Sequence, residues 1–415
     1  MEKKILQTVI TEQQALRYSN KYISRVKQAF MSDNEIVVIS GVRRCGKSTL
    51  LNEIRSKNKE QDYYLNFDDE RLVHFTLDDF QKTCELFVEL FGNQKTYYFD
   101  EIQNIKGWER FVRRLYDYGN KVFVTGSNAS MLSRELGTHL TGRFYQFELY
   151  PFSFSEFIAL KNERIEKTDA YTTKGKGKLK RLFNEYFSVG SFPDYITNRN
   201  KDYLKSLYQS ILYRDVLVRN KLTNEKEMLE LVYFLSSNVA RPVTYNSLAK
   251  TVEIKNASTI KNYLENLENT YLLFLVHKYD TSLKKQMFNA KKSYFIDLAL
   301  IRELGFHVSA DNGRLLENLV FIELKRRSKE VYYHRNKYEC DFVIKEKTKI
   351  INAIQVSWTM EDKTTKEREI NGLIEALKIY NLQEGLILTE NEEKEIKIGS
   401  KKILIYPVWK WMLNL

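Results

Sequence analysis

The chain has 415 residues, a length that favours two to four domains over a single core. Hydrophobic residues make up 43% and charged residues 29%, as in ordinary globular proteins, and no apolar run approaches the roughly 18 residues that a membrane span needs. We therefore expect no membrane partner. Three Cys residues without CxxC spacing and five scattered His residues argue against a disulfide framework and a zinc centre, and the N-terminus lacks the apolar core of a secretion signal. Together these features predict a cytoplasmic location.

The net charge of +12 is unevenly distributed along the chain. Residues 281–350 hold 15 Lys and Arg residues against 9 Asp and Glu residues. Such a surplus favours a polyanionic partner such as nucleic acid, but it also fits a solvated surface that keeps the protein in solution. Charge alone leaves both interpretations open.

The first 150 residues alternate predicted strands with predicted helices, which indicates a P-loop-type α/β domain with a parallel sheet covered on both faces. Apolar residues at helical spacing predict a first helix over residues 13–31. The other predicted elements are strands at 35–40, 63–67, 96–99 and 121–126, and helices at 48–56, 80–92 and 108–119.

The rest of the chain predicts three further domains. Residues 152–220 turn helical and predict a lid, within which Lys174-Gly-Lys-Gly-Lys is the most linker-like stretch and predicts a basic loop. Residues 225–285 follow the helix–turn–helix–strand order of a winged helix, and residues 286–415 return to mixed α/β. The elements predicted here are helices at 179–187, 203–219, 225–236, 244–250, 259–268, 314–327 and 366–380, and strands at 272–277, 331–333, 341–344, 350–356, 385–389 and 403–408.

A glycine-rich segment follows the first predicted strand. Gly41-Val-Arg-Arg-Cys-Gly-Lys-Ser48 matches the Walker A pattern GxxxxGK[ST] at every defined position and opens a helix. Its glycines let backbone N–H groups face a phosphate, Lys47 supplies a point charge to the β- and γ-phosphates, and Ser48 is placed to bind Mg²⁺. The ligands predicted are ATP or ADP with Mg²⁺. The expected nucleotide-binding residues are Gly41, Arg43, Arg44, Cys45, Gly46, Lys47, Ser48 and Thr49.

An apolar strand that ends in an acidic pair supplies the complementary Walker B element. Asp100 would hold the Mg²⁺ shell, and Glu101 would polarise the attacking water. The two motifs together predict ATP hydrolysis, with Lys47 and Glu101 as catalytic residues.

Two further residues are candidates for the γ-phosphate site. Ser127, with Asn128 in reserve, ends the fourth predicted strand and would help to orient the water; ordinary loop capping is the alternative. Arg143 would act as an arginine finger, either in its own site or in that of a neighbouring subunit of a homo-oligomer. A structural ion pair is the alternative for Arg143.

Eight stretches of the chain match a known family. They are GVRRCGKSTLL (41–51), FDEIQNIKGWERFVRRL (99–115), VTGSNASMLSRELGTHLTGRFYQFELYPFSFSEF (124–157), GSFPDY (190–195), YRDV (213–216), LLENLVFIELKRR (315–327), ECDFVI (339–344) and IQVSW (354–358). Through them, over nearly its whole length, the sequence resembles a family of prokaryotic AAA-like ATP-binding proteins of the AAA+ superfamily. The resemblance implies ATP binding, an AAA-like core, a winged-helix middle and an end domain of unknown function with a restriction-endonuclease-like fold, PD-(D/E)XK.

An endonuclease of that fold needs an acidic residue on a helix, an Asp at a strand start, and Glu or Gln followed by one residue and a Lys. Glu317, Asp341 and Gln355 fit the first three positions, but Ser357 stands where the Lys is required. Without the ammonium the water lacks its positioning charge. The pattern therefore argues against nuclease activity and favours a degenerate fold kept for binding or assembly.

The sequence is compatible with two main classes of biological function. The third helix of the middle module begins with Lys255, Asn256, Ser258 and Lys261, residue types that suit phosphate or base-edge contacts, although such modules also serve as packing units. The first class is a DNA-associated ATPase that uses this module and the basic C-terminal region. The second is a nucleotide-dependent switch that binds another protein, and an ATP-regulated nuclease is a weaker third.

Overall fold

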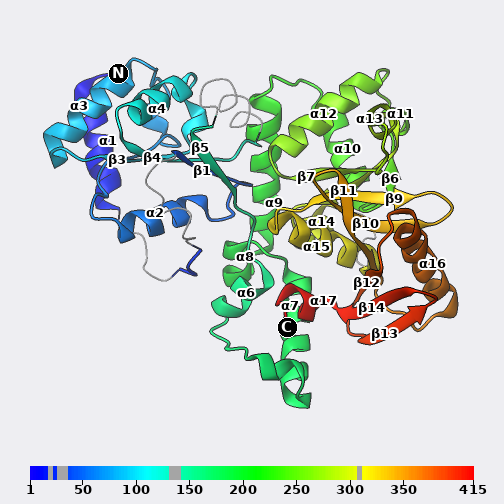
Figure 1. Ribbon diagram of the computed structural model, residues 1–415. Coiled ribbons are helices and arrows are strands. Elements are labelled where there is room, and N and C mark those ends of the chain that lie inside the picture. The colour runs from blue at the N-terminus through cyan, green and yellow to red at the C-terminus, as the bar shows by residue number, and fades with distance from the viewer. Residues whose placement is uncertain (17–21, 26–35, 130–141, 306–310) are drawn as a thin grey trace. The chain divides into compact units, whose positions relative to one another are not determined.

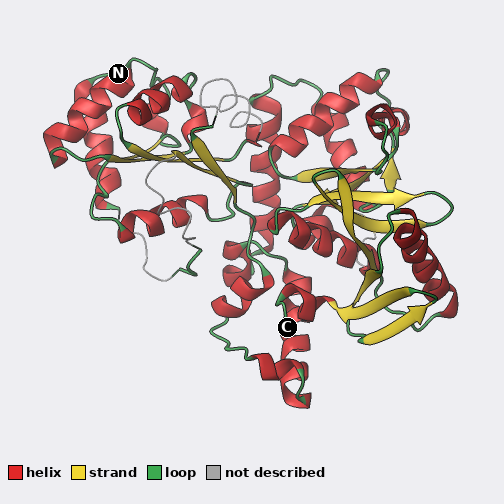
Figure 2. Cartoon of the chain, in the orientation of Figure 1, coloured by secondary structure: helices red, strands yellow, loops and turns green. Residues whose placement is uncertain are grey.

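The computed structural model describes residues 1–16, 22–25, 36–129, 142–305 and 311–415. By their contacts these residues divide into two compact units. The first unit comprises residues 1–150 with 269–271, and the second comprises residues 151–268 with 272–415. Helices and strands occur in both units (Figure 2).

The first unit is built on a five-stranded sheet of order β2-β3-β4-β1-β5 in which every neighbouring pair is parallel (Figure 1). The four predicted strands are confirmed. The fifth, β5, was missed because its sequence, Phe-Tyr-Gln-Phe-Glu, is only partly apolar and the strand is only partly buried. The elements are β1 (Ile36–Ser40), β2 (Tyr64–Asn66), β3 (Thr96–Asp100), β4 (Lys121–Gly126), β5 (Phe144–Glu148), α1 (Lys3–Ala15), α2 (Lys47–Lys57), η2 (Glu70–Leu72), α3 (Asp79–Phe91), η3 (Ile102–Asn104) and α4 (Trp108–Asp117).

Helices cover both faces of this sheet, as the alternating rhythm predicts. Side chains alternate between the two faces of a strand, so Ile36 and Val38 of β1 share one hydrophobic core. Helices α1, α3 and α4 contribute to that same core. Helix α2 buries Leu50, Leu51 and Ile54 outside it. Because the strands are parallel, their carboxyl ends, and the loops that follow them, meet at one edge of the sheet.

The helix predicted over residues 13–31 is wrong in its described part. Helix α1 begins at Lys3 and ends at Ala15, and residues 22–25 are not helical. The apolar stripe that packs on the sheet is Leu6, Val9 and Ile10, which lies before the predicted range. The rest of that range, residues 17–21 and 26–31, lies outside the described residues.

The second unit opens with helices, as predicted for residues 152–220, but the basic loop predicted at 174–178 is wrong. Those residues form the first turns of α7, which begins after the Thr172 cap. Gly175 packs closely on the Asp169 backbone, and a Cβ at this position would lie only 2.4 Å from it. The helices of this part are α6 (Phe154–Leu160), η4 (Lys167–Ala170), α7 (Thr173–Val189), α8 (Pro193–Asn198), α9 (Lys201–Gln209) and η5 (Ser210–Val218).

A small three-stranded antiparallel sheet of order β6-β8-β7 follows, with three helices before its β7–β8 hairpin. The predicted helices and the first hairpin strand are confirmed. Strand β8, which the sequence pattern left in the last segment, pairs with both β6 and β7. The elements are α10 (Glu225–Ser237), β6 (Pro242–Val243), α11 (Tyr245–Thr251), α12 (Ala257–Asn269), β7 (Leu273–His277), α13 (Leu283–Phe288) and β8 (Lys291–Phe295).

The last segment is mixed α/β, as predicted, and forms a six-stranded sheet of order β13-β14-β12-β11-β10-β9, whose strand β13 was not predicted. Leu373, Ala376 and Leu377 of α16 pack on its apolar face. No helix among the described residues is long and apolar enough to cross a membrane. The elements are α14 (Leu298–Leu304), α15 (Asn312–Arg326), β9 (Glu330–Arg335), β10 (Glu339–Glu346), β11 (Lys349–Val356), α16 (Lys363–Ile379), β12 (Glu384–Thr389), β13 (Lys394–Ile398), β14 (Lys401–Pro407) and α17 (Val408–Met412).

Candidate functional site

The glycine-rich loop joins the end of β1 to the start of α2 in the first unit. Gly46 has φ +102°, a left-handed conformation that favours glycine, and it directly precedes the helix. A Cβ on Gly41 would lie 2.1 Å from the carbonyl oxygen of Leu149, so the loop approaches the β5 end too closely for any side chain. Backbone geometry thus explains both glycines of the motif.

Lys47 lies inside this loop with its side chain only 3% exposed. Its Nζ is 3.3 Å from Glu101 Oε1, and it donates to the Val42 carbonyl at 3.3 Å. Burial by itself lowers the pKa of Lys47, but the nearby Glu101 and Asp100 carboxylates outweigh it and raise the pKa. The lysine is therefore a buried, fully charged group at the tip of the sheet.

Asp100 ends β3 and is fully buried beside the loop. The Thr125 hydroxyl of the neighbouring strand donates to its Oδ1, the Tyr64 hydroxyl donates to its Oδ2 at 3.4 Å, and the Ser48 hydroxyl also contacts it. Burial and the Glu101 charge raise the pKa of Asp100 above its usual range. The structure thus brings Ser48 and Asp100 together, as predicted from their motifs.

Glu101 adopts a left-handed backbone with φ +51°, which turns its side chain toward the loop. Its N–H donates to Thr125 Oγ1 at 3.0 Å, and Gln103 Nε2 donates to its Oε2 at 2.6 Å. Burial would raise the pKa of Glu101, but the Lys47 charge and the Gln103 hydrogen bond outweigh it and lower the pKa to about 2. Glu101 is therefore ionised near neutral pH.

Gln103 is a residue of this site that the sequence reasoning missed. Its Nε2 lies 3.3 Å from Ser127 Oγ, so one amide group joins the acidic pair to the end of β4. Its Oε1 is buried and has no hydrogen-bond partner among the described residues. Ser127 and Asn128 are themselves buried, at 2% and 4% exposure. The signal in the sequence was the glutamine two positions after Glu101.

Arg143 is not brought to the loop of its own chain. It immediately precedes β5, whose register with β1 pairs Ile36 with Phe144, so it lies at the amino end of the strands. The loop follows their carboxyl end. Its guanidinium lies 3.0 Å from Asp117 and is 36% exposed, so in this chain it forms a surface ion pair.

The remaining residues predicted to bind nucleotide differ in their surroundings. Arg43 lies 3.9 Å from Asp68, Arg44 is exposed with φ +62°, and Thr49 is exposed on α2. Cys45 is buried, and burial raises the pKa of its thiol above the usual value, so it is not a reactive thiolate.

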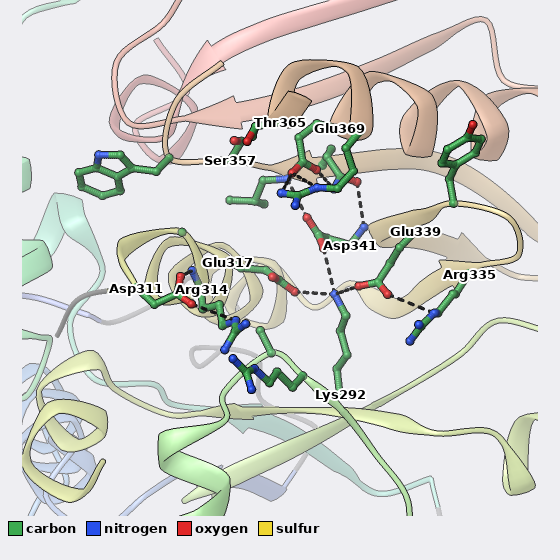
Figure 3. A pocket seen from close by; sticks show the side chains of 18 of the residues that line it. Lys292, Asp311, Arg314, Glu317, Arg335, Glu339, Asp341, Ser357, Thr365 and Glu369 are labelled. Carbon is green, nitrogen blue, oxygen red and sulfur yellow. Dashed lines mark hydrogen bonds and ion pairs between the residues drawn. The ribbon is translucent and has the colours of Figure 1, made fainter. Parts of the chain in front are cut away.

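The second unit holds a separate cleft of about 760 Å³ that contains the nuclease-like positions (Figure 3). Glu317 of α15, Asp341 of β10 and Gln355 of β11 all line it. Gln355 Oε1 accepts the Asp341 N–H at 3.1 Å, and Ser357 Oγ donates to the Thr359 carbonyl at 2.8 Å. Among the described residues, no group of three or more His, Cys, Asp or Glu side chains has the geometry to hold a metal ion.

Helix α12 separates an apolar face from a polar one. Lys255, Asn256, Ser258 and Lys261 at its start are exposed, while Ile260, Tyr263, Leu264 and Leu267 are buried. Lys261 is 3.6 Å from Glu265 on the same helix. The residues predicted for nucleic-acid contact are therefore available on the surface of the second unit.

A five-stranded parallel sheet with a phosphate-binding loop after β1 and an acidic pair after β3 defines an AAA-type P-loop fold. Consistent with this, the family model "AAA domain" matches residues 33–158. Two models described as domains of unknown function, DUF8612 and DUF4143, match residues 180–311 and 312–411.

Two relatives match over almost their whole length. The uncharacterized protein MJ1544 of Methanocaldococcus jannaschii is 36% identical, covering 100% of this chain and 96% of its own. An uncharacterized protein of Haemophilus influenzae is 30% identical, covering 94% and 97%. The chain belongs to the family that these proteins represent, in which an AAA domain precedes two domains of unknown function.

Among solved structures, the chain is similar to the Orc1 protein of Aeropyrum pernix in complex with DNA. The identity is 9%, with 73% of this chain and 90% of that chain covered, at a TM-score of 0.28. A TM-score of this size establishes no common overall arrangement.

Proposed function

We propose that this protein binds ATP with Mg²⁺ and hydrolyses it. The observation that carries the proposal is the convergence of Lys47, Ser48, Asp100 and Glu101 at the carboxyl edge of one parallel sheet. A buried ammonium, a hydroxyl and two carboxylates meet there within hydrogen-bonding distance. The pKa of the Asp100 carboxylate is raised and that of the Glu101 carboxylate is lowered. The match to an AAA domain over these residues supports the same function.

The residues fit a nucleotide with its metal ion. Backbone N–H groups of the glycine-rich loop would surround the β-phosphate, and Lys47 would neutralise the β- and γ-phosphates. Ser48 and Asp100, already in contact, would hold Mg²⁺ directly or through water. When bound, Mg²⁺ supplies positive charge that stabilises the phosphates during transfer.

Glu101 would then act on the attacking water. With its pKa lowered to about 2, it is ionised and able to accept a hydrogen bond from the water near neutral pH. Lys47 would leave Glu101 for the phosphates when ATP binds, which frees the carboxylate for this role. Ser127, which accepts a hydrogen bond from Gln103, would complete the part of the site that faces the γ-phosphate.

Calorimetry and steady-state turnover test the proposal. Lys47→Ala should abolish the heat of ATP binding, whereas Glu101→Gln should bind ATP and lose turnover by about 100-fold or more. Lys57→Ala, at the far end of α2 from the loop, is the matched control and should change neither. A Glu101→Gln protein that turns over ATP like wild type would remove the proposed role of Glu101.

We further propose that the chain works as four parts: an ATPase core (1–150), a helical lid (152–220), a winged helix (225–285) and a nuclease-like end (286–415). Nucleotide state would be coupled to the lid and the C-terminal parts. The absence of disulfides among the described cysteines supports a cytoplasmic location.

Nucleic-acid binding is the second function that we propose, because the start of α12 exposes Lys255, Asn256, Ser258 and Lys261 while its other face is buried. The winged-helix interpretation and the basic residues of the C-terminal part support it. Filter binding of duplex DNA across a salt series should give retention that falls steeply with salt. No retention at low salt would instead favour the nucleotide-dependent switch that binds another protein.

A further inference from the structure

The ammonium of Lys292 lies at the centre of a carboxylate cluster in the cleft of the second unit (Figure 3). Its Nζ is 2.9 Å from Glu317 Oε1, 2.7 Å from Glu339 Oε1 and 2.9 Å from Asp341 Oδ1. The ammonium donates hydrogen bonds to Glu317 and Asp341, and it forms an ion pair with Glu339. The Lys292 side chain is only 1% exposed.

Three elements assemble this cluster. Lys292 comes from β8, Glu317 from α15, and Glu339 and Asp341 from the start of β10. Burial lowers the pKa of Lys292, but Asp341 and Glu317 outweigh burial and raise it well above the usual value. Even with Lys292 present, burial and the Asp341 charge raise the pKa of Glu317 to about 8. The ammonium therefore does not fully offset the effects of burial and of the Asp341 charge on Glu317.

Asp341, Glu317 and the neighbouring Gln355 make further hydrogen bonds. Asp341 Oδ2 accepts the Val356 N–H at 3.0 Å, and Glu317 Oε1 also accepts from the Tyr294 hydroxyl at 2.6 Å. Gln355 Nε2 donates to Glu369. The carboxylate oxygens converge on one point. The ammonium of Lys292 already occupies that point as a cation supplied by the chain itself.

We propose that Lys292 is an internal counter-ion that occupies the position a divalent cation would take between Glu317, Glu339 and Asp341. The cleft therefore works without a bound metal ion. Without the ammonium, the three carboxylates would have to move closer together than they lie with Lys292 present, and they would then form a site for an oxygen-preferring divalent cation such as Mn²⁺ or Mg²⁺. The inference does not depend on the nucleotide site, which lies in the other unit.

The geometry also separates this role from that of a catalytic lysine. A lysine that positions water must face it, whereas the Lys292 side chain is only 1% exposed and its ammonium lies 2.7–2.9 Å from three carboxylates. The position two residues after Gln355 has no ammonium, and Ser357 there is bonded to a backbone carbonyl. Neither residue therefore presents an exposed ammonium to water.

Mn²⁺ titration of nucleotide-free protein, followed by electron paramagnetic resonance, tests the proposal. Lys292→Ala should bind one Mn²⁺ about 100-fold more tightly than wild type, because three carboxylates lose their only shared cation. Its melting temperature should rise with Mn²⁺ concentration. Adding Asp341→Asn should abolish the gain, and Lys337→Ala, an exposed lysine of the same cleft, is the matched control and should bind like wild type.

Measurements on the wild-type protein could overturn the proposal. Tight Mn²⁺ binding to wild type that Asp341→Asn removes would overturn the proposal. So would Mn²⁺-dependent DNA cleavage that Lys292→Ala abolishes, since Lys292 would then be catalytic. If Lys292→Ala fails to fold, Lys292→Met replaces it; recovery of its folding by Mn²⁺ supports the proposal, and failure to gain Mn²⁺ binding when folded overturns it.

Discussion

The Lys47 ammonium and the Glu101 carboxylate form an ion pair of 3.3 Å at the carboxyl edge of the N-terminal sheet. Both groups are largely buried, and each shifts the pKa of the other toward the charged form. The pair satisfies two charges that would otherwise be costly to bury. A phosphate that binds Lys47 competes directly with Glu101, so nucleotide binding and the state of the proposed base are linked.

Gln103 should control turnover more than affinity, because its amide holds Glu101 and Ser127 together. Gln103→Leu should lower kcat for ATP about 10- to 100-fold and change KM by less than about threefold. Steady-state kinetics near neutral pH check this, with the exposed Gln7→Leu on α1 as control. Equal effects of both variants would show no specific role for Gln103.

Arg143 should act on a neighbouring subunit, because it lies at the opposite strand end from the loop of its own chain. Arg143→Ala and Lys47→Ala should each lose ATPase activity. An equal mixture should recover about a quarter of wild-type activity through interfaces that combine one intact Lys47 with one intact Arg143. Asp117→Ala breaks the ion pair but keeps the arginine, and it should stay active. If Arg143→Ala turns over ATP normally, the residue serves only in the ion pair.

Two glycines of α7 should respond oppositely to alanine. A Cβ on Gly177 meets nothing within 4 Å, so Gly177→Ala should raise the free energy of unfolding by about 0.5–1 kcal/mol through helix propensity. A Cβ on Gly175 would lie 2.4 Å from the Asp169 backbone, so Gly175→Ala should lower it by about 1–3 kcal/mol. Urea denaturation checks the pair. The same small change for both variants would mean that this segment is not packed as a helix.

Glu268 should make the second unit less stable as pH rises. Its half-buried side chain accepts the Leu275 N–H at 2.8 Å, and burial raises its pKa to about 7 from an ordinary 4.5. The folded state thus binds this proton more tightly than the unfolded state, so stability is lost between about pH 4.5 and 7. Glu268→Gln keeps the acceptor and should gain about 1–3 kcal/mol at pH 8 but almost nothing at pH 4.

The matched control for that prediction is Glu265→Gln. Glu265 lies one turn earlier, is 54% exposed and forms a surface ion pair with Lys261, so its loss should change stability by less than about 1 kcal/mol. Denaturation of the three proteins at pH 4 and pH 8 separates the outcomes. A gain for Glu268→Gln that is the same at both pH values would contradict a raised pKa.

The amino-acid sequence by itself predicted the candidate nucleotide site and most of the elements around it. Its information there is local: Gly41 and Gly46 are required by backbone conformation and close approach, and Lys47 and Ser48 follow them directly. An apolar strand that ends in Asp100 and Glu101 can be recognised in the same way. Parallel strands then place both motifs at one sheet edge without further information.

Only the tertiary structure decided which distant side chains meet. Gln103 reaches Ser127 because β3 and β4 are parallel neighbours, and Lys292 reaches Glu317, Glu339 and Asp341 because β8, α15 and β10 converge. Local pattern also misjudged residues 174–178, where packing of Gly175 on the Asp169 backbone stabilises a helix that the glycines disfavour. Contacts between residues far apart in sequence leave no periodic signal, so a single sequence cannot reveal them.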